Sequence, residues 1–431
     1  MSPKRQRRLG RVPSRLVLDN GMTIVVKEKD TESVSLGIGV RLGYAHHPAA
    51  HFVEHMVFAG TTSRGAQAIA KEAVQWGGHI DGYTDAYSTF FFAKNLSRYA
   101  ESSLELLCDI VKNSTFPNDR LEREKLAYQE ELRNKRDDPE LVLLDALYRE
   151  VYQRHPIRTT ILEDPRLATE VTRDELFAAY QRFYIPSRLI LVAVGNVKRD
   201  DVHRITERCF GKTPWGFSEP LRIAREAIPG QSRRILLERP GSQQAHLMIG
   251  FRAPHYPSRD YYAMRVLSSL LNEDTGSALY RELRERRGLV YNIVSSYANS
   301  RRTEAFFPYS NSPVSDCSRW HGIFRIMARL SQKNLAEVEQ IIGEQLQKCI
   351  EGEFTAEELC MSQLRLIGRR HLALEGTLKY ARLLFAAELN DDFSGFDEFD
   401  RHVFAVERKD VQRVARLYCS PKAMTTVVLG S

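Results

Sequence analysis

A pair of histidines four residues apart is the feature of this sequence that most directly suggests chemistry. His51 and His55 lie in a stretch whose apolar residues recur at helical spacing. We therefore expect a helix over residues 48–59, with both imidazoles on one face. Two imidazoles so arranged can bind one zinc ion. Glu54, adjacent to His55, can then accept a proton from a water molecule that the metal activates. The order His-x-x-Glu-His predicts a metal-dependent hydrolase.

A catalytic zinc site needs a third protein ligand and keeps its fourth position for water. The charged stretch 121–133 is typical of a helix, and its Glu124 and Glu131 are two turns apart on one face. One carboxylate can bind the metal while the other orients a ligand histidine. The spacing leaves open which residue has which role. The alternative is that both are solvated surface residues.

The composition excludes several other classes of protein. The chain has 431 residues, of which 27% are charged, and its formal net charge is +7. Bases and acids are interspersed without a nucleic-acid-binding motif, so no nucleic-acid partner is expected. The sequence contains no run of 18 or more apolar residues, so no membrane span is expected. Six cysteines without a Cys-x-x-Cys pair do not indicate a disulfide framework, and we expect a reducing, cytoplasmic location of bacterial type. The basic N-terminus is interpreted as a short tail, with organelle import as the alternative.

Two similar segments indicate an internal duplication. Residues 171–186 and 406–421 each predict an amphipathic helix and a Pro turn, followed by a buried strand at 189–194 and 424–429. The beginnings of the halves agree too, and we expect strand pairs at 14–28 with 33–42 and at 233–239 with 245–252, followed by helices at 48–59 and 258–271.

The predicted fold class is α+β. It consists of two homologous α/β-sandwich domains of the split βαβ type, each a mixed or antiparallel sheet with helices on one face. The predicted boundaries are a tail at 1–13, a zinc-binding domain at 14–212, a linker at 213–231 and a second domain at 232–431.

The His-x-x-Glu-His segment and the acidic stretch after it resemble the pitrilysin/insulinase family of metallopeptidases, which includes the mitochondrial processing peptidases. The resemblance runs from about residue 14 to 430 and is most specific at the His-x-x-Glu-His helix. Glu131 lies 76 positions after His55, as the family's downstream acidic helix requires. The resemblance implies one Zn²⁺ per chain, with Glu131 as the third ligand and Glu124 as the acid that orients a ligand histidine. Glu130 is the local competitor of Glu131.

A segment of the second half also resembles the family. Arg284 and Tyr291 match an Arg and a Tyr seven residues apart that reach toward the scissile peptide in the family. Such side chains can stabilise a developing oxyanion. The alternative from the residues alone is an ordinary helix end, with Arg284 solvated, Gly288 at the C-cap and Tyr291 in a strand.

Residues 77–84 resemble the edge strand on which the family docks its peptide by strand addition. By this resemblance Asp81, Gly82, Tyr83 and Thr84 contact the substrate. The sequence departs from the family here, because Asp81 and Gly82 stand where the family usually has Asn and Ala. His79 is interpreted as an ordinary strand or loop residue, not a ligand.

The resemblance implies a zinc-dependent endopeptidase that hydrolyses unfolded peptides or peptide leaders inside a dimeric chamber. The chain carries both the zinc motif and the Arg/Tyr segment, which favours a homodimer. A heterodimer with an inactive relative is the other arrangement. The alternative function is that of a non-catalytic scaffold or partner subunit.

Overall fold

The computed structural model describes residues 12–159, 162, 164–214, 216, 222–223, 226–272, 276–297, 318–319 and 321–430. Residues 1–11 of the predicted tail and much of the predicted linker lie outside this set. The strands are β1 (Ser14–Val17), β2 (Thr23–Glu28), β3 (Ser33–Val40), β4 (His79–Thr84), β5 (Thr89–Leu96), β6 (Leu189–Gly195), β7 (Arg233–Glu238), β8 (Gln244–Arg252), β9 (Val290–Ser296), β10 (Ile323–Ser331) and β11 (Thr425–Gly430).

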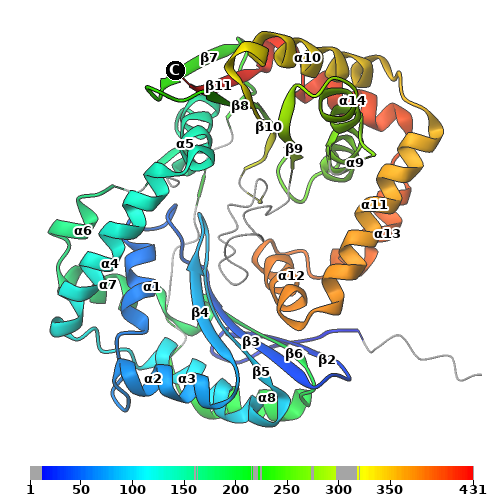
Figure 1. Ribbon diagram of the computed structural model, residues 1–431. Coiled ribbons are helices and arrows are strands. Elements are labelled where there is room, and N and C mark those ends of the chain that lie inside the picture. Colours follow the sequence, from blue (N-terminus) through cyan, green and yellow to red (C-terminus); the bar gives the residue numbers. More distant parts are fainter. Residues whose placement is uncertain are drawn as a thin grey trace, which may run out of the picture. The chain divides into compact units, whose positions relative to one another are not determined.

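The helices alternate with these strands along the chain (Figure 1). No described helix combines the length and the apolar composition that crossing a membrane requires. The helices are α1 (Ala50–Val57), α2 (Ala66–Gln75), α3 (Ala100–Lys112), α4 (Asn118–Asp137), α5 (Pro139–Val151), α6 (Leu167–Glu170), α7 (Arg173–Phe183), α8 (Arg199–Phe210), α9 (Tyr261–Asn272), α10 (Leu335–Glu351), α11 (Ala356–Glu375), α12 (Thr377–Leu389), α13 (Phe399–Phe404) and α14 (Arg408–Tyr418).

Five strands of the first sheet repeat the order of the second sheet, and the first sheet has β1 in addition. The first has the order β1-β2-β6-β3-β5-β4 and the second the order β7-β11-β8-β10-β9. In each sheet one pair is parallel, β6 with β2 and β11 with β7, and it joins the last strand of the half to a strand near its beginning. All other pairs are antiparallel. The shared order is the structural counterpart of the repeated segments, and it confirms a mixed α+β fold present twice.

Apolar runs explain why β6 and β11 are central strands. Every residue of Leu189–Gly195 is buried, and so is every residue of Thr425–Gly430. A continuous run of this kind is typical of a strand covered on both faces. Each run follows a helix and a Pro turn, α7 and α14 respectively, as the repeat predicted.

Grouping residues by their contacts gives two units that exchange segments of chain. The first contains the described parts of Met1–Gln129, Pro165–Leu221 and Ala373–Asp391, and the second contains those of Glu130–Asp164, Arg222–Leu372 and Asp392–Ser431. Helix α12, from the second half of the sequence, therefore packs on β3 and β6, and α5, from the first half, packs on β8 and β11. The predicted boundaries 14–212 and 232–431 describe the two repeats along the sequence, and they stay a prediction.

Each exchanged helix lies against a strand glycine. A Cβ added at Gly39 of β3 would lie 1.9 Å from the Phe385 ring of α12, and one added at Gly250 of β8 would lie 2.4 Å from Leu147 of α5. Both positions therefore need a glycine for close approach. Figure 1 shows α12, in orange, on the sheet of blue strands.

The exchange explains a difference from the predicted architecture. The helices on the other side of the first sheet, α3 and α8, cover one face as expected. The opposite face, predicted to lack helices, is covered by α12, where Ser35 of β3 shares a 2.9 Å hydrogen bond with Thr377. Helical periodicity marks the face that a helix buries but not the sheet against which it is buried.

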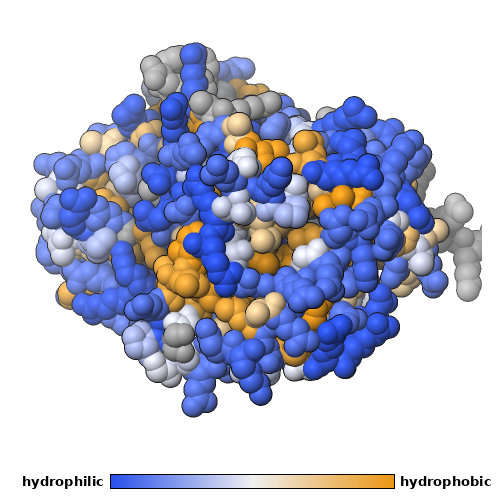
Figure 2. Space-filling view, turned by 90° about the horizontal axis from the view of Figure 1, so that it is seen from above, coloured by the Kyte–Doolittle hydropathy of each residue, from blue (hydrophilic) through white to orange (hydrophobic). Residues whose placement is uncertain are grey.

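The face drawn in Figure 2 is mostly hydrophilic, and hydrophobic residues show between the hydrophilic ones. A mixture of this kind is normal for a protein surface.

Candidate metal centre

Helix α1 carries the two histidines predicted to bind metal. It begins at Ala50 and ends at Val57, inside the predicted range, and its apolar residues Phe52, Val53 and Met56 are fully buried. Packing of these residues fixes the rotation of the helix about its axis. His51 is buried and His55 partly buried, so both imidazoles lie on a face that is covered rather than open to solvent.

The imidazole nitrogens converge. His51 Nε2 and His55 Nε2 lie 3.3 Å apart. Two nitrogens bound to one tetrahedral zinc ion, each at about 2.0–2.1 Å, would lie about 3.3–3.4 Å apart. The observed separation therefore fits a pair of ligands to one ion. The other nitrogen of His55, Nδ1, lies 3.4 Å from Glu124 Oε2, the arrangement by which a carboxylate orients a ligand imidazole.

The acidic side chains come from one continuous helix, α4. Potential ligand atoms of His51, His55 and Glu131 all lie within 4.8 Å of one another, and theirs is the candidate metal group found among the described residues. Glu131 also forms a 3.0 Å ion pair with Lys135, one turn later. Glu130 is exposed and pairs with Arg133 at 3.1 Å.

Tyr128 is a structural residue of this site that the sequence analysis missed. It is fully buried, and its ring stacks on Phe52 with centroids 4.7 Å apart and an angle of 8° between the planes. The same ring lies 5.0 Å from the imidazole of His51 and 5.6 Å from that of His55. It fixes α4 against α1. Its position four residues after Glu124 and three before Glu131 could have indicated that it shares their face.

Glu54 faces the edge strand β4. Its Oε2 accepts a 2.8 Å hydrogen bond from the Thr84 hydroxyl, and both residues are buried. A Cβ added at Gly82 would lie 2.9 Å from Glu54 Oε1. The predicted general base therefore lies against the strand that was predicted to dock the substrate.

The remaining predicted residues of β4 also have internal partners. The Asp81 carboxylate accepts a 2.9 Å hydrogen bond from the Gly82 N–H and lies 3.4 Å from His79 Nε2. Burial raises the pKa of Tyr83, and the nearby Glu54 charge acts in the same direction. Among the described strands, β4 pairs with β5 alone, so within this part of the chain it is an edge strand with one side available for strand addition.

Arg284 and Tyr291 lie together in the second unit. Arg284 belongs to the π-helical segment Tyr280–Arg286, and its guanidinium lies 5.1 Å from the Tyr291 ring centroid and donates to the Tyr291 carbonyl. Tyr291, in β9, is 74% exposed. Gly288, between them, has a positive φ of 62°, as a residue that ends a helix often has.

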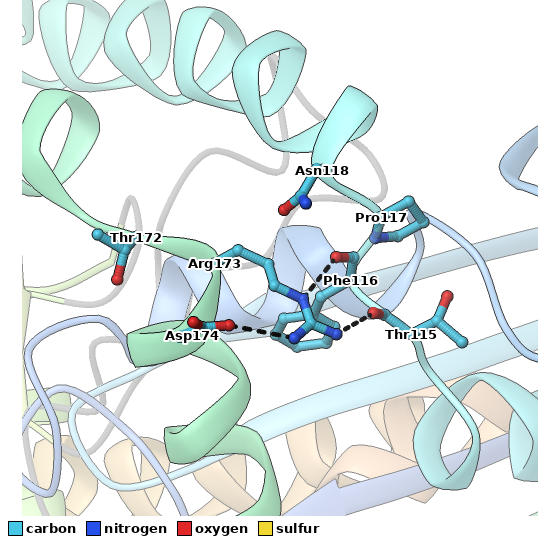
Figure 3. Close-up of a pocket in the computed structure, with 7 residues that line it drawn as sticks. All are labelled: Thr115, Phe116, Pro117, Asn118, Thr172, Arg173 and Asp174. Carbon is cyan, nitrogen blue, oxygen red and sulfur yellow. Dashed lines mark hydrogen bonds and ion pairs between the residues drawn. The ribbon is translucent and has the colours of Figure 1, made fainter.

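A pocket of about 370 Å³ lies beside the start of α4 (Figure 3). Arg173, the first residue of α7, donates hydrogen bonds to the carbonyls of Phe116 (3.2 Å) and Thr115 (3.0 Å), and it pairs with Asp174. These bonds hold the segment that leads into α4. The pocket contains none of the predicted site residues.

The neighbouring histidine His46 has a structural role. Burial, together with the charges of Arg188 and Arg41, lowers its pKa to about 3. It is therefore neutral at ordinary pH. Its Nδ1 accepts a 3.3 Å hydrogen bond from the Gly43 N–H, in the turn that leads to α1.

Relatives with known sequences cover nearly the whole chain. The uncharacterized zinc protease YmxG of Bacillus subtilis is 26% identical over 84% of this chain and 85% of its own length. An uncharacterized zinc protease of Mycobacterium tuberculosis is 26% identical over 94% of this chain and 90% of its own length.

Solved structures share the fold. A protease from Helicobacter pylori has a TM-score of 0.87 at 21% identity and covers 98% of this chain and 100% of its own. A structure described as a peptidase M16 inactive domain, from Pseudomonas fluorescens, has a TM-score of 0.84 at 19% identity and covers 97% of this chain and 98% of its own.

Two models of one family match successive parts of the sequence. Residues 23–165 match the model "Insulinase (Peptidase family M16)", and residues 170–366 match "Peptidase M16 inactive domain". The first match contains the histidine pair and the acidic helix, and the second contains no His-x-x-Glu-His sequence. The chain belongs to the pitrilysin/insulinase family of peptidases, M16.

Proposed function

We propose that this protein is a zinc-dependent endopeptidase in which His51, His55 and Glu131 hold one Zn²⁺. The observation that carries the proposal is the convergence of these three side chains, with ligand atoms within 4.8 Å of one another. Two neutral imidazoles and one carboxylate are the ligand set of many catalytic zinc sites. The relatives named as zinc proteases support the same metal.

The chain's own residues prepare the reaction. Zinc, when bound, supplies Lewis acidity, which acidifies water and polarises a carbonyl. Glu54 accepts the proton of the attacking water and delivers it to the leaving amine. Glu124 orients the imidazole of His55 through Nδ1. Glu131, which pairs with Lys135 in this structure, would hold the metal together with the two histidines.

We further propose that β4 binds an unfolded peptide as an added strand, through residues 81–84. Main-chain hydrogen bonds would then bind any extended sequence, and the side chains would set the preference. Arg284 and Tyr291 stabilise the oxyanion in this proposal. Their mutual contact and the exposure of Tyr291 support a role outside the core. A homodimeric chamber, in which these residues serve the partner's zinc, follows from the family resemblance.

A second candidate is a non-catalytic partner subunit. The match of residues 170–366 to the model of the family's inactive domain favours it. In this case the protein would bind an active relative and cleave nothing alone.

One experiment separates the candidates. The purified protein, loaded with zinc, is incubated with a library of unstructured peptides, and products are identified by mass spectrometry. The proposal predicts cleavage that a chelator abolishes and zinc restores. Glu54→Gln should retain about one zinc per chain while kcat falls by about 10²- to 10⁴-fold. Absence of cleavage by the zinc-loaded parent, or full activity of Glu54→Gln, would contradict the proposal.

A further inference from the structure

The hydroxyl of Thr84 forms a buried contact that peptide docking does not use. Docking by strand addition uses the main chain of β4, whereas the Thr84 side chain turns inward. Thr84 is 3% exposed, and its Oγ1 donates to Glu54 Oε2 at 2.8 Å. A hydrogen bond from a neutral donor to a carboxylate is among the stronger kinds.

Two further atoms fix Thr84 in turn. Its Oγ1 lies 3.1 Å from the Thr89 Oγ1 of β5, and Thr89 Oγ1 donates to the Leu42 carbonyl at 2.9 Å. Thr89 and Leu42 are fully buried. Thr84 and Thr89 are direct cross-strand partners in the β4–β5 ladder. A chain of hydroxyls therefore runs from the buried segment after β3 to the carboxylate.

Gly82 completes the arrangement from the same face of β4, because residues two apart on a strand point to the same side. An added Cβ at this position would lie 2.9 Å from Glu54 Oε1 and 3.1 Å from the Phe58 ring. One oxygen of Glu54 is thus held by a hydroxyl, and the other lies against a position without a side chain. The Thr84 hydroxyl therefore fixes one oxygen, while Gly82 leaves room beside the other.

We propose that Thr84 and Thr89 are positioning residues that hold the Glu54 carboxylate in the orientation for proton transfer. This inference rests on the proposed function, since it assigns these residues to the same site. Thr84 then has two separate roles: its main chain belongs to the edge for the peptide, and its hydroxyl orients the base. A base displaced by about 1 Å can lose about 100-fold in rate.

The test compares Thr84→Val, which keeps the shape but removes the hydroxyl, with Thr84→Ser, which keeps the hydroxyl. Thr23→Val is the matched control, because Thr23 is a buried threonine in β2 of the same sheet. We expect Thr84→Val to lower kcat about 10- to 100-fold with KM and zinc content unchanged, and Thr84→Ser and Thr23→Val to retain activity near that of the parent. Thr89→Val should give a smaller loss than Thr84→Val.

A crystal structure of each zinc-free variant gives a second readout. We expect one Glu54 conformer in the parent and in Thr84→Ser, and a shifted or doubled conformer in Thr84→Val. A Thr84→Val protein with the parent's kcat, or with an unmoved Glu54, would overturn the inference. A parent that cleaves no peptide would overturn the proposed function instead, and the conformers of Glu54 would still test the inference.

Discussion

In the first half of the chain, α1 follows β3 and carries His51, Glu54 and His55. In the second half, α9 follows β8 at the same point of the topology, and Tyr261–Asn272 contains neither His nor Glu. The strand orders match, so the fold itself does not confer the chemistry. Three side chains on one helix, with acids from α4, distinguish a candidate metal centre from its structural copy.

The largest expected effect comes from removing the acid of α4. Glu131→Gln should lower zinc affinity by more than about 100-fold, because an amide is a poor substitute for a carboxylate ligand. This loss exceeds the range typical of residues that only hydrogen-bond to a metal ligand. Zinc titration with a competing chelator measures it. Glu357→Gln is the matched control and should leave zinc affinity unchanged, because Glu357 is an exposed residue of α11. Helix α11 follows β10 and α10 in the second half, as α4 follows β5 and α3 in the first. Equal zinc affinity in both variants would remove the distinction between the halves.

A buried acid in the β4–β5 turn, Asp85, gives the next effect, on stability. Burial raises its pKa to about 6, although it accepts hydrogen bonds from the N–H groups of Tyr87 and Ser88. The folded state therefore binds this proton more tightly than the unfolded state. Its contribution to stability is complete below about pH 4 and is lost as pH rises through 6.

Asp85→Asn keeps the acceptor oxygen and removes the charge. Relative to the parent, the variant should gain about 1–3 kcal/mol in free energy of unfolding between pH 4 and 7. Urea unfolding of both zinc-free proteins across this range measures the difference, in which titration of the shared histidines cancels. A difference that stays constant with pH would show that Asp85 titrates normally.

The smallest effect is expected at Gly82. Gly82→Ala would bring a methyl group against Glu54 Oε1, the mobile end of its side chain, so a small shift can accommodate it. The family pattern usually has Ala here, which agrees with tolerance. We expect kcat to fall less than about tenfold, well below the loss in Thr84→Val. A loss as large as that of Glu54→Gln would mean that the carboxylate cannot adjust.

The sequence predicted the parts of this site that depend on local spacing. Residues four apart on a helix share a face, which is enough to pair His51 with His55. Spacing alone could not distinguish Glu131 from Glu130, and the choice between them rested on the family resemblance. In the structure, Tyr128 packs against Phe52 and fixes the rotation of α4, which leaves Glu130 exposed.

Other features depend on tertiary structure and could not be predicted. The contact between Thr84 and Glu54 depends on the register of β4 against β5 and on how α1 packs against β4. The exchange of α5 and α12 between the sheets depends on glycines at Gly39 and Gly250 that meet helices distant in sequence. Periodicity shows which face of an element is buried but not its neighbour.

The central claim is that His51, His55 and Glu131 bind the same ion. Crystals of the protein grown with one equivalent of zinc, measured at the zinc absorption edge, locate the metal directly. The account predicts one anomalous peak per chain, within bonding distance of His51 Nε2, His55 Nε2 and a Glu131 oxygen. A peak bound elsewhere, or one bound by the histidines with Glu131 still paired to Lys135, would contradict it.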